Sequence, residues 1–284
     1  MITVSATAFG VPADLEMPKL TDVMPNSLTW VVMVIIIGGV TTWIAAKGYG
    51  MVSKVANWMA PIIVLAFLAC GLVAAKQLEI KSFSEFFSVW GEGSEPFPGQ
   101  MKYTFWHVLL WSWFCNAAMH IGMSDLSVFR YAKSPGSGWS TAAGMYVGHY
   151  MAWIAASLLY AVYLETPEAA AFLADGAAPP VAPGPLAYNA LGWFGIITVI
   201  LAGWTTANPT IYRSGLAFQA ILTKLSISKA TILAGVLATA AGIFPAFAMK
   251  LLDFVAVYGF ILAPVGAIIV FEHFFADRYG VVKD

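Results

Sequence analysis

The feature that most constrains this chain is a series of apolar stretches, each about as long as a membrane is thick. A helix needs about 20 mostly apolar residues to cross a bilayer. Seven stretches meet this requirement, at about residues 28–46, 55–75, 101–123, 141–163, 190–222, 230–247 and 252–276. The sequence therefore predicts an all-α integral membrane protein, in which residues 1–284 form one transmembrane domain and residues 1–27 an outer segment.

The composition supports this fold class. The 284 residues include 14 Lys and Arg and 15 Asp and Glu, so 10% are charged, whereas soluble domains carry about 25%. Hydrophobic residues make up 60% of the chain, and the mean hydropathy is +0.78. These values exclude a soluble globular protein and a disordered chain. A net charge of −1 also provides no basic surface for nucleic acid, so no nucleic-acid partner is expected.

Basic residues in the connections predict the orientation, because cytoplasmic loops carry more Lys and Arg than outer loops. One side has eight: Lys47, Lys54, Arg130, Lys133, Lys224, Lys229, Arg278 and Lys283. The other side has five: Lys19, Lys76, Lys81, Lys102 and Lys250. The loop from 165 to 188 has no basic residue. We therefore expect a multi-pass protein of the plasma or inner membrane, with a cytoplasmic C-terminus.

The sequence gives no sign of an enzyme. It has no nucleophile elbow, zinc-protease motif, phosphate-binding loop or dinucleotide fingerprint. The four histidines are not spaced as metal ligands, and Cys70 and Cys115 lie in apolar segments. No catalytic residue, metal or organic cofactor is therefore expected. Carboxylates are nearly absent from the spans, which argues against a proton relay and favours a neutral ligand.

Polar residues within two spans are the candidate binding residues. In the stretch 101–123, Ser112, Asn116 and His120 share one helical face, and Trp113 and Phe114 lie beside it. This face either lines a binding site, with an aromatic ring to stack on a flat ligand, or forms hydrogen bonds that pack two helices together.

The stretch 190–222 contains Thr205 and Thr206, followed by Asn208 and Pro209. Proline removes a backbone N–H and disturbs the preceding turn, so we expect a break here that frees the carbonyls of Ala202 and Thr205. Freed carbonyls and hydroxyls are hard oxygen ligands for a small cation. Alternatively, the two threonines only bond back to carbonyls one turn earlier.

Two further patterns concern packing. Phe83, Phe86, Phe87 and Trp90 recur at helical spacing between polar residues, which indicates either a short helix at the outer membrane interface or a lid packed on the protein. The glycine pairs Gly38–Gly39 and Gly144/Gly148 are typical of close helix packing.

Several segments, taken in order, resemble nucleobase–cation symporter family one, which includes cytosine, purine, uracil, allantoin and hydantoin permeases. These segments are GYG at 48–50, NWMAP at 57–61, SDLSVFRYAKS at 124–134, WTTANP at 204–209, APVG at 263–266 and EHFF at 272–275. The resemblance covers nearly the whole chain. It implies an inverted-repeat fold of the leucine-transporter type, of which this chain corresponds to the fourth to tenth helices.

The resemblance also implies roles for single residues. The Ala202 carbonyl and the Thr205 and Thr206 hydroxyls match half of the family's cation site. Asn208 is a candidate to hydrogen-bond the substrate. Asn116 aligns with a tryptophan that lies under the ligand in hydantoin transporters, so stacking here has to come from Trp113, Phe114 or elsewhere.

The leading hypothesis is therefore a secondary active transporter, or a fragment of one, that carries a small neutral nitrogen heterocycle such as a nucleobase with a coupling cation, Na⁺ or H⁺. The alternative is a non-transporting membrane scaffold or regulatory subunit. Residues 1–10 resemble the apolar tail of a span cut short. We accordingly expect the chain to lack N-terminal helices of the full fold, supplied by an upstream or partner segment.

Overall fold

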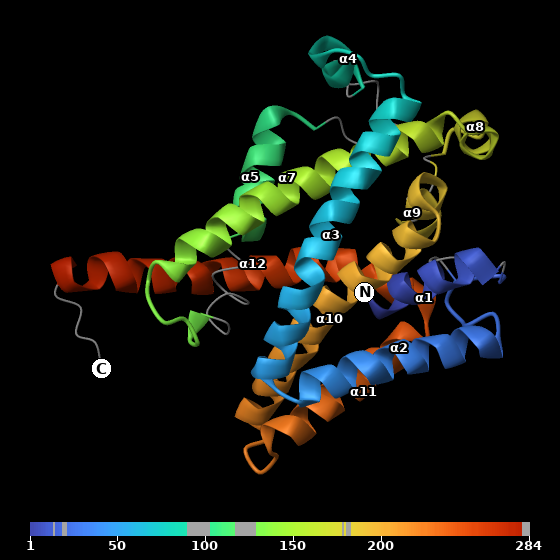
Figure 1. The fold of residues 1–284 in the computed structure, drawn as a ribbon. Coiled ribbons are helices and arrows are strands. Elements are labelled where there is room, and N and C mark those ends of the chain that lie inside the picture. Colours follow the sequence, from blue (N-terminus) through green and yellow to red (C-terminus); the bar gives the residue numbers. More distant parts are fainter. Residues whose placement is uncertain are drawn as a thin grey trace. The chain divides into compact units, whose positions relative to one another are not determined.

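The structure is a computed structural model that describes residues 1–13, 15–18, 22–89, 103–116, 129–177, 179 and 183–279. Every regular element in these ranges is a helix (Figure 1). The elements are α1 (Ile2–Gly10), η1 (Val11–Ala13), α2 (Leu28–Ala46), α3 (Tyr49–Gln77), α4 (Phe83–Ser88), α5 (Phe105–Asn116), α7 (Ser137–Leu164), α8 (Pro167–Ala174), α9 (Pro183–Leu191), α10 (Trp193–Ile221), α11 (Ile227–Gly242), α12 (Pro245–Phe275) and η3 (Ala276–Tyr279).

Five of the described helices are long and apolar enough to cross a membrane. They are Leu28–Ala46, Tyr49–Gln77, Ser137–Leu164, Trp193–Ile221 and Val257–Phe275. The length and apolar composition of these helices confirm the prediction of an all-α, multi-pass membrane protein. Helix α5 covers the middle of the predicted stretch 101–123, and the end of that stretch, including His120, lies outside the described residues.

The chain divides into two compact units. The first consists of Met1–Gln100 and Met145–Ala248, and the second of Met101–Gly144 and Met249–Asp284. The candidate residues on α10 belong to the first unit, whereas those on α5 belong to the second.

Local signals explain several helix ends. Helix α2 begins after Ser27, whose hydroxyl accepts a hydrogen bond from the Trp30 amide at 3.2 Å. It ends before Gly48, which has φ = +91°, a conformation that glycine adopts without strain. The bounds Leu28–Ala46 agree with the predicted stretch.

Other predicted bounds are wrong. The stretch 190–222 is interrupted at Gly192, which has φ = +56° and separates α9 from α10. The predicted break between 247 and 252 lies instead after Gly242, because Pro245 starts α12 and proline fits the first turn of a helix. Lys250, which suggested a loop, lies inside this helix.

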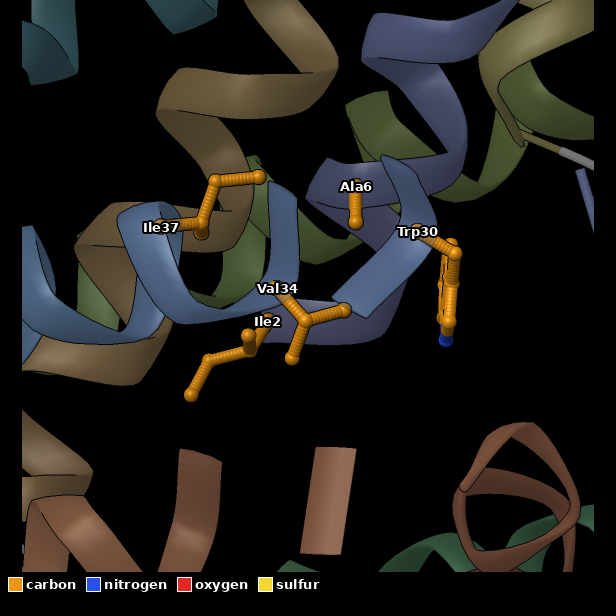
Figure 2. Packing of buried hydrophobic residues seen from close by; sticks show 5 residues of the cluster. All are labelled: Ile2, Ala6, Trp30, Val34 and Ile37. Carbon is orange, nitrogen blue, oxygen red and sulfur yellow. The ribbon is translucent and has the colours of Figure 1, made fainter. Parts of the chain in front are cut away.

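Helix α10 organises the first unit. It contacts α1, α2, α3, α9 and α11, and α2 also packs along α11 (Figure 1). Figure 2 shows the main buried cluster, in which Ile2 and Ala6 of α1 meet Trp30, Val34 and Ile37 of α2. Trp204 of α10 packs against this cluster, so the middle of α10 is held from two sides.

Close glycine–hydroxyl contacts join the helices of this unit. A Cβ atom on Gly38 would overlap Thr239, one on Gly235 would overlap Thr42, and one on Gly215 would overlap Thr231. In a membrane the lipid is as apolar as the helix surfaces, so hydrophobic burial contributes little to helix association. Small residues stabilise it instead, because they let two helices approach closely. The packing interpretation of Gly38 is thus confirmed.

The other predicted packing glycines behave differently. No described atom lies within 4 Å of a Cβ built on Gly39, Gly144 or Gly148. Close helix packing is therefore not observed at these positions in the described part of the chain.

Candidate functional site

The three predicted cation ligands lie together on α10. The Thr205 hydroxyl donates to the Ala202 carbonyl at 3.0 Å, and the Thr206 hydroxyl donates to the same oxygen at 3.0 Å. One carbonyl thus accepts two hydroxyls from the following turn. The arrangement gathers three hard oxygens, and it is also the back-bonded geometry considered as the alternative interpretation. The sequence prediction of a cation site here stays a prediction.

The expected break at Pro209 is wrong. Helix α10 runs from Trp193 to Ile221 with Pro209 inside it. The reason is that one proline removes one i→i−4 bond, and the surrounding helix continues where neighbouring helices support it. Because Pro209 has no N–H, the Thr205 carbonyl loses its ordinary partner at i+4. The predicted freeing of the Thr205 carbonyl therefore needs no unwinding of the helix, whereas the Ala202 carbonyl accepts the two threonine hydroxyls.

Asn208 is the most unusual polar residue on α10. It is 1% exposed, and neither its Oδ1 nor its Nδ2 atom has a hydrogen-bond partner among the described residues. A buried amide without partners costs about 1–3 kcal/mol relative to one that is hydrogen-bonded. Asn208 therefore presents an unused acceptor and an unused donor inside the helix group.

The surroundings of Asn208 follow from its neighbours on α10. One turn earlier, Trp204 packs against the cluster that contains Ile37 of α2. One turn later, Ile211 clusters with Ala45 of α2. Asn208 therefore lies on the part of α10 that packs alongside α2.

Trp204 was not among the predicted site residues. Its indole Nε1 is buried and has no partner in the described part of the structure. Trp204 and Asn208 are at i and i+4, so both lie on one face of the helix. The spacing was readable from the sequence, but the absence of an indole partner depends on which helices pack around it.

Two hydroxyls in the neighbouring helices share this property. Ser5 of α1 and Thr42 of α2 are buried, and their oxygens have no hydrogen-bond partner among the described atoms. All the buried polar side chains in the described residues are uncharged, being threonines, one serine and Asn208. The interior of the first unit is therefore polar in places but electrically neutral.

The remaining predicted site residues lie on α5, in the second unit. Trp113 is 73% exposed and Phe114 is half-buried, with its ring centroid 6.3 Å from that of Trp111. Asn116 is the last residue of the helix, and its side chain lies outside the described part of the structure. A binding role for these three residues stays a prediction.

The arrangement on α10 can bind through hydrogen bonds and oxygen ligands. Among the described residues, no group of three or more His, Cys, Asp or Glu is placed to hold a metal ion. Comparison of the chain with protein-family models, curated proteins and solved structures finds no match.

Proposed function

We propose that this chain is a secondary active transporter, or part of one, that carries a small neutral nitrogen heterocycle of the nucleobase type together with a coupling cation. The proposal rests mainly on the environment of Asn208. Neither the donor nor the acceptor of its buried amide has a partner among the described residues. A nucleobase edge offers an acceptor and a donor in matching positions, so binding would satisfy both atoms of the amide at once.

The position of the oxygen cluster supports cation coupling. Ala202, Thr205 and Thr206 lie within one to two turns of Asn208 on the same helix. A hydroxyl can turn its hydrogen toward one partner and offer its lone pairs to an ion. In transporters of the inverted-repeat type, substrate and cation bind close together near the middle of the membrane. Sodium or a proton could occupy such a site, and the experiment below distinguishes them.

The neutral interior supports an uncharged substrate. A charged ligand would need a counter-charge, and the buried polar residues described in the first unit have none. In this proposal Trp204 supplies a further donor through its indole nitrogen. The sequence prediction that Trp113, Phe114 and Asn116 contact the ligand is kept as a separate hypothesis, which the variants below test.

Ligand-induced stabilisation of the purified chain tests the proposal. We expect nucleobases and related heterocycles, screened as a panel, to raise the unfolding temperature more in sodium than in choline at constant ionic strength. If the coupling ion is a proton, the stabilisation depends on pH instead of sodium. Trp113→Ala and Asn116→Ala should weaken the ligand affinity, because aromatic stacking on a base is worth about 1–3 kcal/mol.

The second candidate is a non-transporting membrane scaffold. The observation that favours it is that both threonine hydroxyls already have a partner in the Ala202 carbonyl. In that case the polar groups only pack helices. No stabilisation by any heterocycle, with or without sodium, together with a folded chain, would favour the scaffold.

A further inference from the structure

The short helix α4 has an exposed aromatic face. Phe83 is 81% exposed and Phe87 is 64% exposed, while Phe86 is half-buried. Their rings contact one another, with centroid distances of 6.3 Å, 6.0 Å and 5.5 Å. Three phenylalanine rings that pack on each other form one continuous apolar patch on a helix of six residues.

Local hydrogen bonds hold this helix together. The Ser82 hydroxyl accepts from the Glu85 amide at 3.2 Å, and the Glu85 carboxylate accepts from the Lys81 amide at 2.5 Å. This pair is a variant of the capping box, in which the carboxylate bonds the amide one residue before the N-cap. The helix is therefore formed by its own polar residues, and the three rings are not needed to hold it in place.

The polar side of α4 faces the protein. Glu85 and Ser88 of α4 line a hollow together with Glu79, which follows α3, with Ala161 of α7, and with Glu165, which follows α7. The three carboxylates keep this hollow in contact with water, because an unpaired buried carboxylate is very costly. A lid would turn its rings inward and its carboxylate outward. Here the carboxylate lines the inner hollow, and two of the three rings are largely exposed.

Helix α3 is long enough to bring α4 to the edge of a bilayer. Its 29 residues extend about 44 Å, whereas the hydrocarbon core is about 30 Å thick. It ends at Gln77, six residues before Phe83. Leu65, Leu68 and Leu72 on α3 are at least half exposed, so α3 offers an apolar surface to lipid in the turns before it ends.

We propose that α4 lies on the membrane surface, with Phe83, Phe86 and Phe87 inserted at the boundary between the lipid headgroups and the acyl chains. An amphipathic helix binds there through its apolar face while its polar face stays in water. The occupant of the aromatic patch is thus phospholipid. Of the two sequence interpretations of α4, the interface helix and the lid, this inference favours the interface helix, and it does not depend on the proposed transport function.

Spin labelling of the full chain in phosphatidylcholine vesicles tests the proposal. Cys70 and Cys115 are first replaced by alanine, and a nitroxide is attached at Phe87→Cys or, as the matched control, at Ser88→Cys on the polar side. Accessibility to oxygen, which partitions into lipid, is compared with accessibility to a water-soluble nickel chelate. We expect a several-fold higher oxygen-to-nickel ratio at position 87 than at position 88.

Each other outcome overturns the proposal. A label at 87 that meets mainly the nickel chelate places the patch in water. A label at 87 that meets neither reagent shows that protein covers the patch, as a lid would. The measurement is repeated in nanodiscs that hold one chain each, to distinguish contact with lipid from contact with a second copy. If lipid covers the patch, the oxygen-to-nickel ratio is the same as in vesicles. If a second copy covered it in vesicles, accessibility to both reagents rises.

Discussion

Ser5 of α1 lies against Gly203 of α10 so closely that a Cβ atom on Gly203 would overlap the Ser5 hydroxyl oxygen. The next atoms that this Cβ would meet, the Met1 carbonyl oxygen and the Ser5 Cβ, are 3.4 Å and 3.6 Å away. The Ser5 oxygen itself is buried, and no described atom forms a hydrogen bond with it. One oxygen atom therefore decides whether α10 tolerates a larger residue beside Ala202.

The first prediction follows from this contact. Gly203→Ala should lower the free energy of unfolding by about 1–3 kcal/mol, because it forces an overlap in a packed interior. Ser5→Ala should raise it slightly, since a buried unpartnered hydroxyl is removed. The double variant should be more stable than Gly203→Ala alone, as measured by unfolding in mixed micelles. Gly39→Ala, where no described atom lies nearby, is the control and should not destabilise the chain. Equal stability of Gly203→Ala and the double variant would contradict the contact.

The second prediction separates stability from binding at Asn208. Asn208→Leu keeps the branching and the number of side-chain heavy atoms and removes an amide that has no described partner, so the ligand-free chain should become more stable by about 1–3 kcal/mol. Ligand-induced stabilisation should be lost in the same variant. The control is Thr198→Val, which removes a buried hydroxyl that donates to the Phe194 carbonyl at 2.8 Å and should leave ligand binding intact. A marked loss of stability in Asn208→Leu would show that the amide is paired.

Local signals made the ends of α2 predictable from the sequence. Ser27 caps its start and Gly48 follows its end, and both act within a few residues. The predicted stop near Lys250 failed for a related reason. A charge suggested a loop, but Pro245 had already set the start of the helix that contains it.

The candidate site was predictable only in part. The sequence predicted that one helix carries four candidate residues, Ala202, Thr205, Thr206 and Asn208. In the structure the first three are joined by hydrogen bonds. The isolation of the Trp204 indole and the Asn208 amide was not readable, because it depends on what α1 and α2 place against them. Pro209 misled for the same reason, since neighbouring helices keep α10 straight enough to continue.

The third prediction concerns the oxygen cluster. Thr205→Ala and Thr206→Ala should each raise the sodium concentration needed for half-maximal ligand stabilisation by about tenfold, since a contact to a charged group is worth about 1.5–3 kcal/mol. Thr205→Ser keeps the hydroxyl and should have a smaller effect. Thr210→Ala removes a similar back-bonded hydroxyl one turn later, 2.8 Å from the Thr206 carbonyl, and should leave the sodium dependence unchanged. Unchanged sodium dependence in both alanine variants would mean that the two hydroxyls only stabilise the helix.

The fourth prediction concerns the orientation of α7, which is 28 residues and therefore about 42 Å long. Exposed residues lie beyond both of its ends, Ser134 before the helix and Ala177 after it. Because basic residues cluster on the Ser134 side and none lies between 165 and 188, Ala177→Cys should react with an impermeant thiol reagent in intact cells. Ser134→Cys should react only after permeabilisation, with Cys70 and Cys115 replaced by alanine in both variants. Labelling of both positions from outside would mean that α7 does not cross the membrane, and reversed labelling would overturn the orientation and the resemblance that agrees with it.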